Sequence, residues 1–164
     1  MRKMLVALSM IGLVSAASAQ EINKNASDSF GVFGGITAAK TAGESSTGYS
    51  IGADYTKYIA NGFFVQPSIQ FIGSRTEFND KHVVGLIDGG YTFILDNNIT
   101  ISPKAGVGYR HTNFDGGSDS GVAYNVGVDV GFAKNWNAGL NYIRMKGENG
   151  HHADFTTLSI GYKF

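Results

Sequence analysis

The last seven residues, LSIGYKF, predict a β-strand whose two faces differ sharply. Side chains alternate between the faces of a strand with a period of two. One face of this strand would carry only apolar side chains: Leu158, Ile160, Tyr162 and Phe164. Such a strand needs an apolar environment along one whole side, and this requirement limits the folds open to the chain more than any other segment does.

The same alternation runs through the chain after residue 28, and no helical period of 3.6 residues competes with it. Val126 and Val128, for example, alternate with Asn125 and Gly127. We therefore predict an all-β fold, an eight-stranded antiparallel up-and-down barrel. Its strands are expected over residues 29–39, 47–59, 63–74, 82–95, 99–112, 121–133, 137–146 and 154–164.

Short and long connections alternate between these strands. Both termini should then lie at the tight-turn end, as in a transmembrane β-barrel with short turns on one side and longer loops on the other. Pro67 and Pro103 fall within strands, where each loses a ladder hydrogen bond, and we expect a local bulge at each. Tight turns rich in Asn, Asp and Gly are expected at residues 60–62, 96–98 and 134–135. Longer links are expected at residues 40–46, 75–81, 113–120 and 147–153.

The N-terminus resembles a secretory signal peptide. Arg2 and Lys3 give a short positive region, residues 4–14 are apolar, and residues 17–19 (ASA) form a small-residue cleavage site. The apolar stretch is too short to span a bilayer as a helix, which takes about 20 residues. We therefore expect a signal peptide over residues 1–19 and one barrel domain over residues 20–164.

The composition limits the chemistry and the location of the protein. The chain has no cysteine, which excludes disulfides, thiolate nucleophiles and cysteine metal sites. Without Arg2 and Lys3, 11 basic residues stand against 13 acidic ones, so there is no positive field for nucleic acid. Charged residues make up 16% of the chain, against about 25% in soluble domains. Beyond the predicted signal peptide no apolar run could form a transmembrane helix, so a membrane location would require a barrel.

Alternation alone does not say which row of side chains faces the barrel interior. A soluble lipocalin-like barrel would hold its apolar row inside. The other row, however, is mostly Gly, Ser, Thr, Asn and Gln, which suit the crowded interior of an eight-stranded barrel better than a water-facing surface. The aromatic residues of the apolar row also form two groups near the strand ends, as expected for interfacial girdles in a membrane. The group near the tight turns is Tyr55, Phe63, Phe93, Phe132, Trp136, Tyr162 and Phe164, and the group near the loops is Tyr49, Phe71, Tyr109, Tyr124 and Tyr142.

With its signal peptide, its eight alternating strands and its Tyr162-Lys163-Phe164 end, the chain resembles the small eight-stranded outer-membrane barrels of Gram-negative bacteria. This family includes the OmpA membrane domain, OmpX/Ail-type proteins and opacity-type surface proteins. The resemblance implies a location in the cell outer membrane, with outer-membrane lipid, lipopolysaccharide and the barrel-assembly machinery as partners. It also implies that Leu158, Ile160, Tyr162 and Phe164 form the signal that this machinery reads. We expect a monomer that binds no cofactor and no nucleic acid.

The inward row carries six charged residues that we predict to form an interior salt-bridge network. Reflecting each strand about its turn puts Lys104 opposite Asp129, at about 5 Å, and one diagonal step of about 7–8 Å from Asp88. Buried charges must be paired, which favours a network that closes the lumen over a proton or ion path. The six residues are Asp54, Asp88, Lys104, Arg110, Asp129 and Lys163.

No residue pattern predicts a catalytic or metal site. His151 and His152 are adjacent in a loop, where their side chains point apart, and a metal would need further ligands. Some eight-stranded barrels are lipid A deacylases with a histidine and a serine two residues apart on one strand. The matching stretch here, residues 111–113, is His-Thr-Asn and has no serine. Residues 115–119 are expected to form a flexible acidic loop rather than a calcium site. The sequence therefore predicts a protein that is not an enzyme.

Four outward basic residues near the loops could bind the phosphates of lipopolysaccharide, or could be interfacial charges that only extend towards water. They are Lys40, Arg75, Arg144 and Lys146. We predict a non-enzymatic envelope structural protein with a closed polar interior and short surface-exposed loops. The alternatives are a surface adhesin or a protein that binds complement or host factors, and a narrow porin.

Overall fold

The computed structural model describes residues 27–41, 44–74, 81–95, 99–114, 117–147 and 152–164, all of which lie in strands or in short connections. The predicted signal peptide, residues 1–19, lies outside the described residues. The strand segments are β1 (Ser29–Thr41), β2 (Glu44–Ala60), β3 (Phe63–Ser74), β4 (Lys81–Tyr91), β5 (Phe93–Ile94), β6 (Thr100–Phe114), β7 (Gly117–Gly131), β8 (Trp136–Gly147) and β9 (His152–Lys163).

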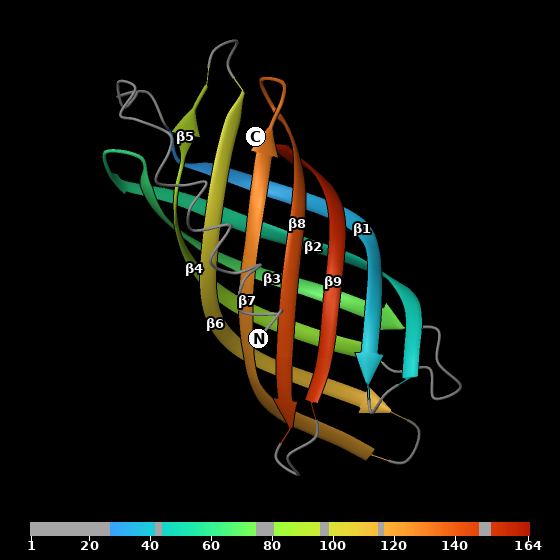
Figure 1. Cartoon of the computed structure of the whole chain (residues 1–164). Coiled ribbons are helices and arrows are strands. Elements are labelled where there is room, and N and C mark those ends of the chain that lie inside the picture. The colour runs from blue at the N-terminus through green and yellow to red at the C-terminus, as the bar shows by residue number, and fades with distance from the viewer. Residues whose placement is uncertain (1–26, 42–43, 75–80, 96–98, 115–116, 148–151) are drawn as a thin grey trace, which may run out of the picture.

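The strands form one closed antiparallel barrel (Figure 1). Each strand pairs with its neighbours in the chain, and β1 pairs with β9 to close the ring. Segments β4 and β5 are two parts of one crossing, since both pair with β6 in the same register. The barrel therefore has eight strands, and the predicted fold is confirmed.

The predicted tight turn between β2 and β3 is confirmed. Asn61 and Gly62 have φ angles of 47° and 87°, and no other non-glycine residue of the described chain has a positive φ. Two consecutive left-handed residues form the turn type that matches the twist of a β-hairpin. The carbonyl of Gly62 also accepts a hydrogen bond from the Thr92 N–H at 2.9 Å, which ties this turn to the break between β4 and β5.

Two of the four long links expected at the opposite end are wrong. Strand β1 continues to Thr41 and β2 begins at Glu44, while β6 continues to Phe114 and β7 begins at Gly117. Two residues therefore join each pair, in place of the longer links predicted at 40–46 and 113–120. The reason is that backbone hydrogen bonds can extend a hairpin whatever its side chains are. Where the strand ends are polar, they show no apolar alternation, and the sequence does not reveal that the strand continues.

The bulges predicted at the prolines are also wrong. The β2–β3 register is the same on both sides of Pro67, and its shift lies instead between Tyr58 and Ala60. Pro103 pairs in regular register with Val128 and stands opposite the end of β4 at Tyr91. Because proline lacks the N–H, one hydrogen bond of the ladder is lost. A bulge needs an extra residue in one strand, and none is inserted here.

The apolar row faces outwards. Ile36 is 63% exposed, Val126 56% and Ile160 52%, whereas their inward neighbours are buried or half-buried. At the tight-turn end the aromatic rings meet edge to face: the ring centroids of Trp136 and Tyr162 lie 5.2 Å apart. These rings form the girdle predicted for that end. Within the described residues, no helix is long and apolar enough to cross a membrane.

Candidate functional site

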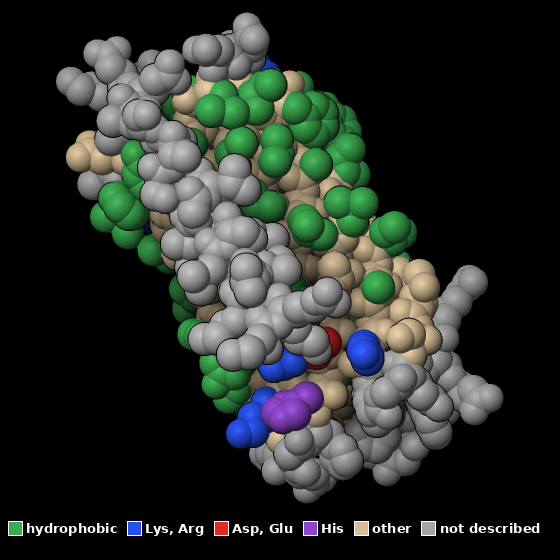
Figure 2. Space-filling model, viewed as in Figure 1, with side chains coloured by type: hydrophobic (Ala, Val, Ile, Leu, Met, Phe, Trp, Pro, Cys, Tyr) green, Lys and Arg blue, Asp and Glu red, His purple; other side chains and the backbone are tan. Residues whose placement is uncertain are grey.

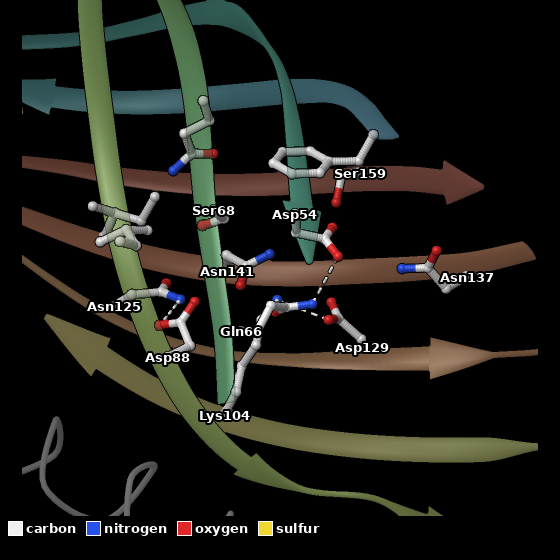
Figure 3. Close-up of a pocket in the computed structure, with 14 residues that line it drawn as sticks. Asp54, Gln66, Ser68, Asp88, Lys104, Asn125, Asp129, Asn137, Asn141 and Ser159 are labelled. Carbon is white, nitrogen blue, oxygen red and sulfur yellow. Dashed lines mark hydrogen bonds and ion pairs between the residues drawn. The ribbon is translucent and has the colours of Figure 1, made fainter. Parts of the chain in front are cut away.

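The half of the lumen nearer the tight turns holds a polar cluster centred on Lys104 (Figure 3). The Lys104 Nζ donates to Asp129 Oδ2 at 2.7 Å and to Gln66 Oε1 at 2.9 Å. The Gln66 amide then donates to Asp54 Oδ1 at 3.1 Å and to the Thr56 hydroxyl at 3.0 Å. The uncharged amide of Gln66 thus connects the Lys104 cation to a second carboxylate. No charge pattern in the sequence indicates this link.

Of the two carboxylates predicted beside Lys104, Asp129 is its salt-bridge partner, whereas Asp88 is not. Lys104 stands opposite Gly127, and Asp129 stands two residues further along β7, opposite Ser102. The long lysine side chain reaches Asp129 diagonally, so the two groups meet although the predicted register was wrong by two residues. Asp88 accepts instead from Asn125 Nδ2 at 2.9 Å, on the far side of β6.

A second layer of the lumen is apolar. Its members come from six strands and are almost fully buried, and Val84, Ala123, Ile143 and Met145 are 0% exposed. The predicted closed polar interior is therefore only partly polar, since the side chains of this layer offer no hydrogen bond to an ion or water. The cluster consists of Ala39, Ile72, Val84, Leu86, Ala123, Ile143, Met145 and Phe155.

A third layer, polar again, lies beyond the apolar one at the loop end. Arg110 forms a salt bridge with Asp119 and also donates to the Thr112 hydroxyl. The Thr112 oxygen lies 2.8 Å from His82 Nδ1. Thr112 therefore links Arg110 to the imidazole of His82 through its hydroxyl oxygen, which has two lone pairs and one proton.

The apolar layer separates Arg110, which belongs to the third layer, from the other charges of the predicted network. Asp119, expected in a flexible acidic loop, lies instead within β7 and supplies the partner of Arg110. Lys163 stands opposite Gly31 at the tight-turn end, and its positive charge acts electrostatically on the Asp54 carboxylate. Among the described residues, no group of three or more histidine or acidic side chains could hold a metal ion.

A cluster of basic side chains lies on the outer wall at the loop end, across β8, β9 and β1. Arg144 forms two hydrogen bonds with the carboxylate of Asp154, at 2.8 and 3.0 Å. Lys40 stands opposite the same Asp154 from β1, and Lys146 stands opposite His152. We call Lys40, Arg144, Lys146 and His152 the basic rim. Figure 2 shows basic and histidine side chains gathered at the lower end of this face, below the hydrophobic band. Arg75, the fourth predicted contact, lies outside the described residues.

The structure gives His111 a serine partner that its own strand lacks. His111 Nδ1 lies 2.9 Å from the Ser120 hydroxyl, which stands directly opposite on β7. Both belong to the outward row near the loop end. Sequence analysis missed the pair because it considered serines on the same strand only. In the described part of the chain, His111 donates no hydrogen bond to a carboxylate.

The C-terminal residues of the predicted assembly signal lie on the outer wall. Leu158 is 54% exposed and Phe164 is 70% exposed. The Phe164 N–H donates to the Phe30 carbonyl at 2.8 Å, and the two rings lie 6.2 Å apart. The last residue of the chain therefore takes part in the closing ladder.

Comparisons with known proteins agree with this geometry. The model of the outer membrane protein beta-barrel domain family matches residues 6–164. Among solved structures, Neisserial surface protein A has a TM-score of 0.65 at 14% identity, over 84% of this chain and 97% of that one. The outer membrane enzyme PagL has a TM-score of 0.60 at 14% identity, over 83% and 99%. Ail, the attachment invasion locus protein of Yersinia pestis, has a TM-score of 0.54 at 17% identity, over 84% and 97%.

A search of curated proteins gives no significant match. At these identities the structural similarities concern the fold alone, and the similar structures include a surface protein, an attachment protein and an enzyme. The family match, in contrast, covers nearly the whole chain and confirms the resemblance seen in the sequence. The chain belongs to the outer-membrane β-barrel domain family, whose members reside in the cell outer membrane.

Proposed function

We propose that this protein is a monomeric structural component of the outer membrane whose basic rim binds the phosphate groups of lipopolysaccharide. One observation carries the proposal: Lys40, Arg144 and Lys146 lie on neighbouring strands around a single carboxylate, Asp154. Asp154 supplies one negative charge, to Arg144, and neither lysine has a salt bridge among the described residues, so the basic rim keeps a positive charge that a phosphate can neutralise. Arginine and lysine are the side chains that proteins use for this contact with phosphate.

The position of the basic rim supports the same function. The rim residues follow directly on the outward apolar row, at the end opposite both described tight turns. In a bilayer this depth corresponds to the headgroups of the outer leaflet. A phosphate held there would tie the barrel to its surrounding lipid.

A triple substitution to glutamine at Lys40, Arg144 and Lys146 tests the proposal. We expect several-fold less lipopolysaccharide per barrel after gentle detergent extraction of outer membranes. The matched control replaces Lys57 and Lys134, which are exposed at the opposite end, and should leave recovery unchanged. Equal recovery from the triple variant would overturn the proposal.

Sulfated sugars on a host surface are the alternative anion for the basic rim. Ail of Yersinia pestis has been solved in complex with the heparin analogue sucrose octasulfate. The two-residue links at 42–43 and 115–116 offer little chain for a larger host-binding loop. Retention of cells on heparin, lost in the triple variant while lipopolysaccharide recovery persists, would favour the adhesin.

A second candidate function is hydrolysis of a lipid ester, favoured by the His111–Ser120 pair. A histidine that accepts the serine proton can activate the hydroxyl as a nucleophile. The pair has no carboxylate to orient the histidine, so we rank this function below the structural one. Mass spectrometry of lipid A from cells with the wild-type and Ser120→Ala proteins decides the matter: a loss of deacylated species in the variant would establish an enzyme.

The route to the membrane is part of the proposal. We infer export by the signal peptide over residues 1–19 and insertion by the barrel-assembly machinery, which would read the outward residues of β9. Deletion of Phe164 should lower the outer-membrane yield and leave chain in the periplasm. Wild-type levels of inserted protein after this deletion would argue against the assembly signal.

A further inference from the structure

The polar half of the lumen contains a cavity of about 30 Å³. By this measure a water molecule needs roughly 10–15 Å³, so there is room for about two particles of that size. Figure 3 shows the polar side chains around it. Among the residues that line the cavity are Asp54, Ser68, Asp88, Asn125, Asn141 and Ser159.

Two hydrogen-bond donors around this cavity, the Lys104 ammonium and the Gln66 amide, already have acceptors. Lys104 donates to Gln66 and Asp129, and the Gln66 amide donates to Asp54 and Thr56. What remains unpartnered is a pair of acceptors, the side-chain carbonyl oxygens of Asn125 and Asn141. Asn125 is only 3% exposed, so bulk water does not supply the missing donor.

The charges around the cavity do not balance either. Asp129 is neutralised by Lys104 at 2.7 Å, whereas neither Asp54 nor Asp88 has a salt bridge among the described residues. Lys163 acts on Asp54 only through space. Asp88 has only the neutral amide of Asn125 as its hydrogen-bond partner, although it is 2% exposed. Lys104 acts on Asp88 electrostatically but forms its salt bridge with Asp129, so the buried Asp88 carboxylate has no direct counter-ion among the described residues.

We propose that the cavity binds one small monovalent cation, such as Na⁺, held by the amide oxygens of Asn125 and Asn141 and neutralising Asp88. A single cation would give the two amide oxygens a partner and the Asp88 carboxylate a counter-charge. A divalent ion is a poorer fit, because Ca²⁺ takes six to eight oxygen ligands and usually several carboxylates. Among the described residues, no group of three or more acidic or histidine side chains is arranged to hold a metal ion.

Thermal unfolding of the refolded barrel in detergent tests the proposal. We expect the midpoint in sodium chloride to lie several degrees above that in N-methylglucamine chloride at equal ionic strength, since the organic cation is too large for the cavity and a bound ligand stabilises the folded state. Asp88→Asn should abolish this difference. Asp154→Asn, which removes a carboxylate on the outer wall, should retain it.

Crystals of the wild-type protein soaked in Tl⁺ provide a readout that requires no variant. An anomalous peak between Asn125 and Asn141 is expected. Equal midpoints in the two salts, or a sodium effect that persists in Asp88→Asn, would overturn the site. A cavity without an anomalous peak would do the same, and would leave it occupied by water beside a protonated carboxyl group.

Discussion

The two main layers of the lumen solve the same packing problem in different ways. The layer nearer the tight turns is filled by Lys104, Asp129 and Gln66, joined by hydrogen bonds of 2.7–3.1 Å with the Asp54 carboxylate. The layer nearer the loops is filled by apolar side chains such as Ile143 and Phe155 that have no polar partner to find. Both point inwards by the same alternation, so alternation decides direction but not chemistry.

The difference predicts which layer prevents the passage of ions. A polar layer can admit water and ions, because its groups can exchange one hydrogen-bond partner for another. An apolar layer cannot, because an ion that crosses it loses its hydration without compensation. We therefore assign the barrier to conduction to the apolar layer and conformational specificity to the polar one. Four substitutions test this assignment and the packing of the outer wall of the barrel.

Lys104→Met should destabilise the barrel most. It leaves Asp129 buried and without its cation, and breaking a buried pair costs about 3–5 kcal/mol. Urea unfolding after refolding in lipid measures the change at neutral pH. The loss should shrink at low pH, where the carboxylates are neutral. Lys57→Met, at an exposed position, is the control. A variant as stable as wild type at neutral pH would contradict the role of the polar layer.

Ile143→Ala should destabilise the barrel by about 2–5 kcal/mol, because it leaves a void in the apolar layer. It should also raise single-channel conductance in planar bilayers, where the wild type should show no stable channel. The matched control is Ile160→Ala on the neighbouring strand, which removes the same atoms from the outer wall and should conduct no better than wild type. Stable wild-type channels would favour the porin.

Val128→Arg tests the wall that surrounds both layers. Val128 points outwards near the middle of the outward apolar row that runs from Val122 to Phe132, and an arginine on the lipid face near the bilayer midplane costs about 2–4 kcal/mol. Val122→Arg, on the same strand near the loop end, should cost about 0–1 kcal/mol. Equal unfolding midpoints for the two variants in lipid would show that depth in the membrane is assigned wrongly.

Thr157→Val should have the smallest effect. Thr37 and Thr157 share a hydrogen bond of 2.9 Å between the polar and apolar layers, and both are almost fully buried. Removing one hydroxyl leaves the other unpaired, at a cost of about 1–3 kcal/mol. The double variant Thr37→Val/Thr157→Val should recover much of this loss. A double variant less stable than the single one would mean that the boundary between the layers requires polar side chains.

The sequence predicted the fold and the direction of each side chain because both follow from a period of two. The inward positions of Asp54, Asp88 and Lys104 needed nothing more. The register between strands is harder to predict, since it depends on where a hairpin turns, and polar residues near a turn give no sign of it. The expected pairing of Lys104 was therefore wrong by two residues, although the length of lysine corrected the contact.

The partners inside the lumen depend on which long side chains meet across it. Gln66 joins Lys104 to Asp54 although it carries no charge. Asn125 of β7 donates a hydrogen bond to Asp88 of β4, although these two strands are not adjacent. Contacts of this kind are properties of the closed ring, and no single segment contains them.

The pairing of β1 with β9 has a consequence for the rate of folding. Gly31 pairs with Lys163, so the ladder that closes the ring joins the two ends of the described chain. Loop-closure entropy makes such distant pairing slow, and every other ladder can form before it. Until it forms, β1 and β9 are unpaired edges that another chain could extend. The interval before ring closure is therefore the period in which this protein is most exposed to aggregation.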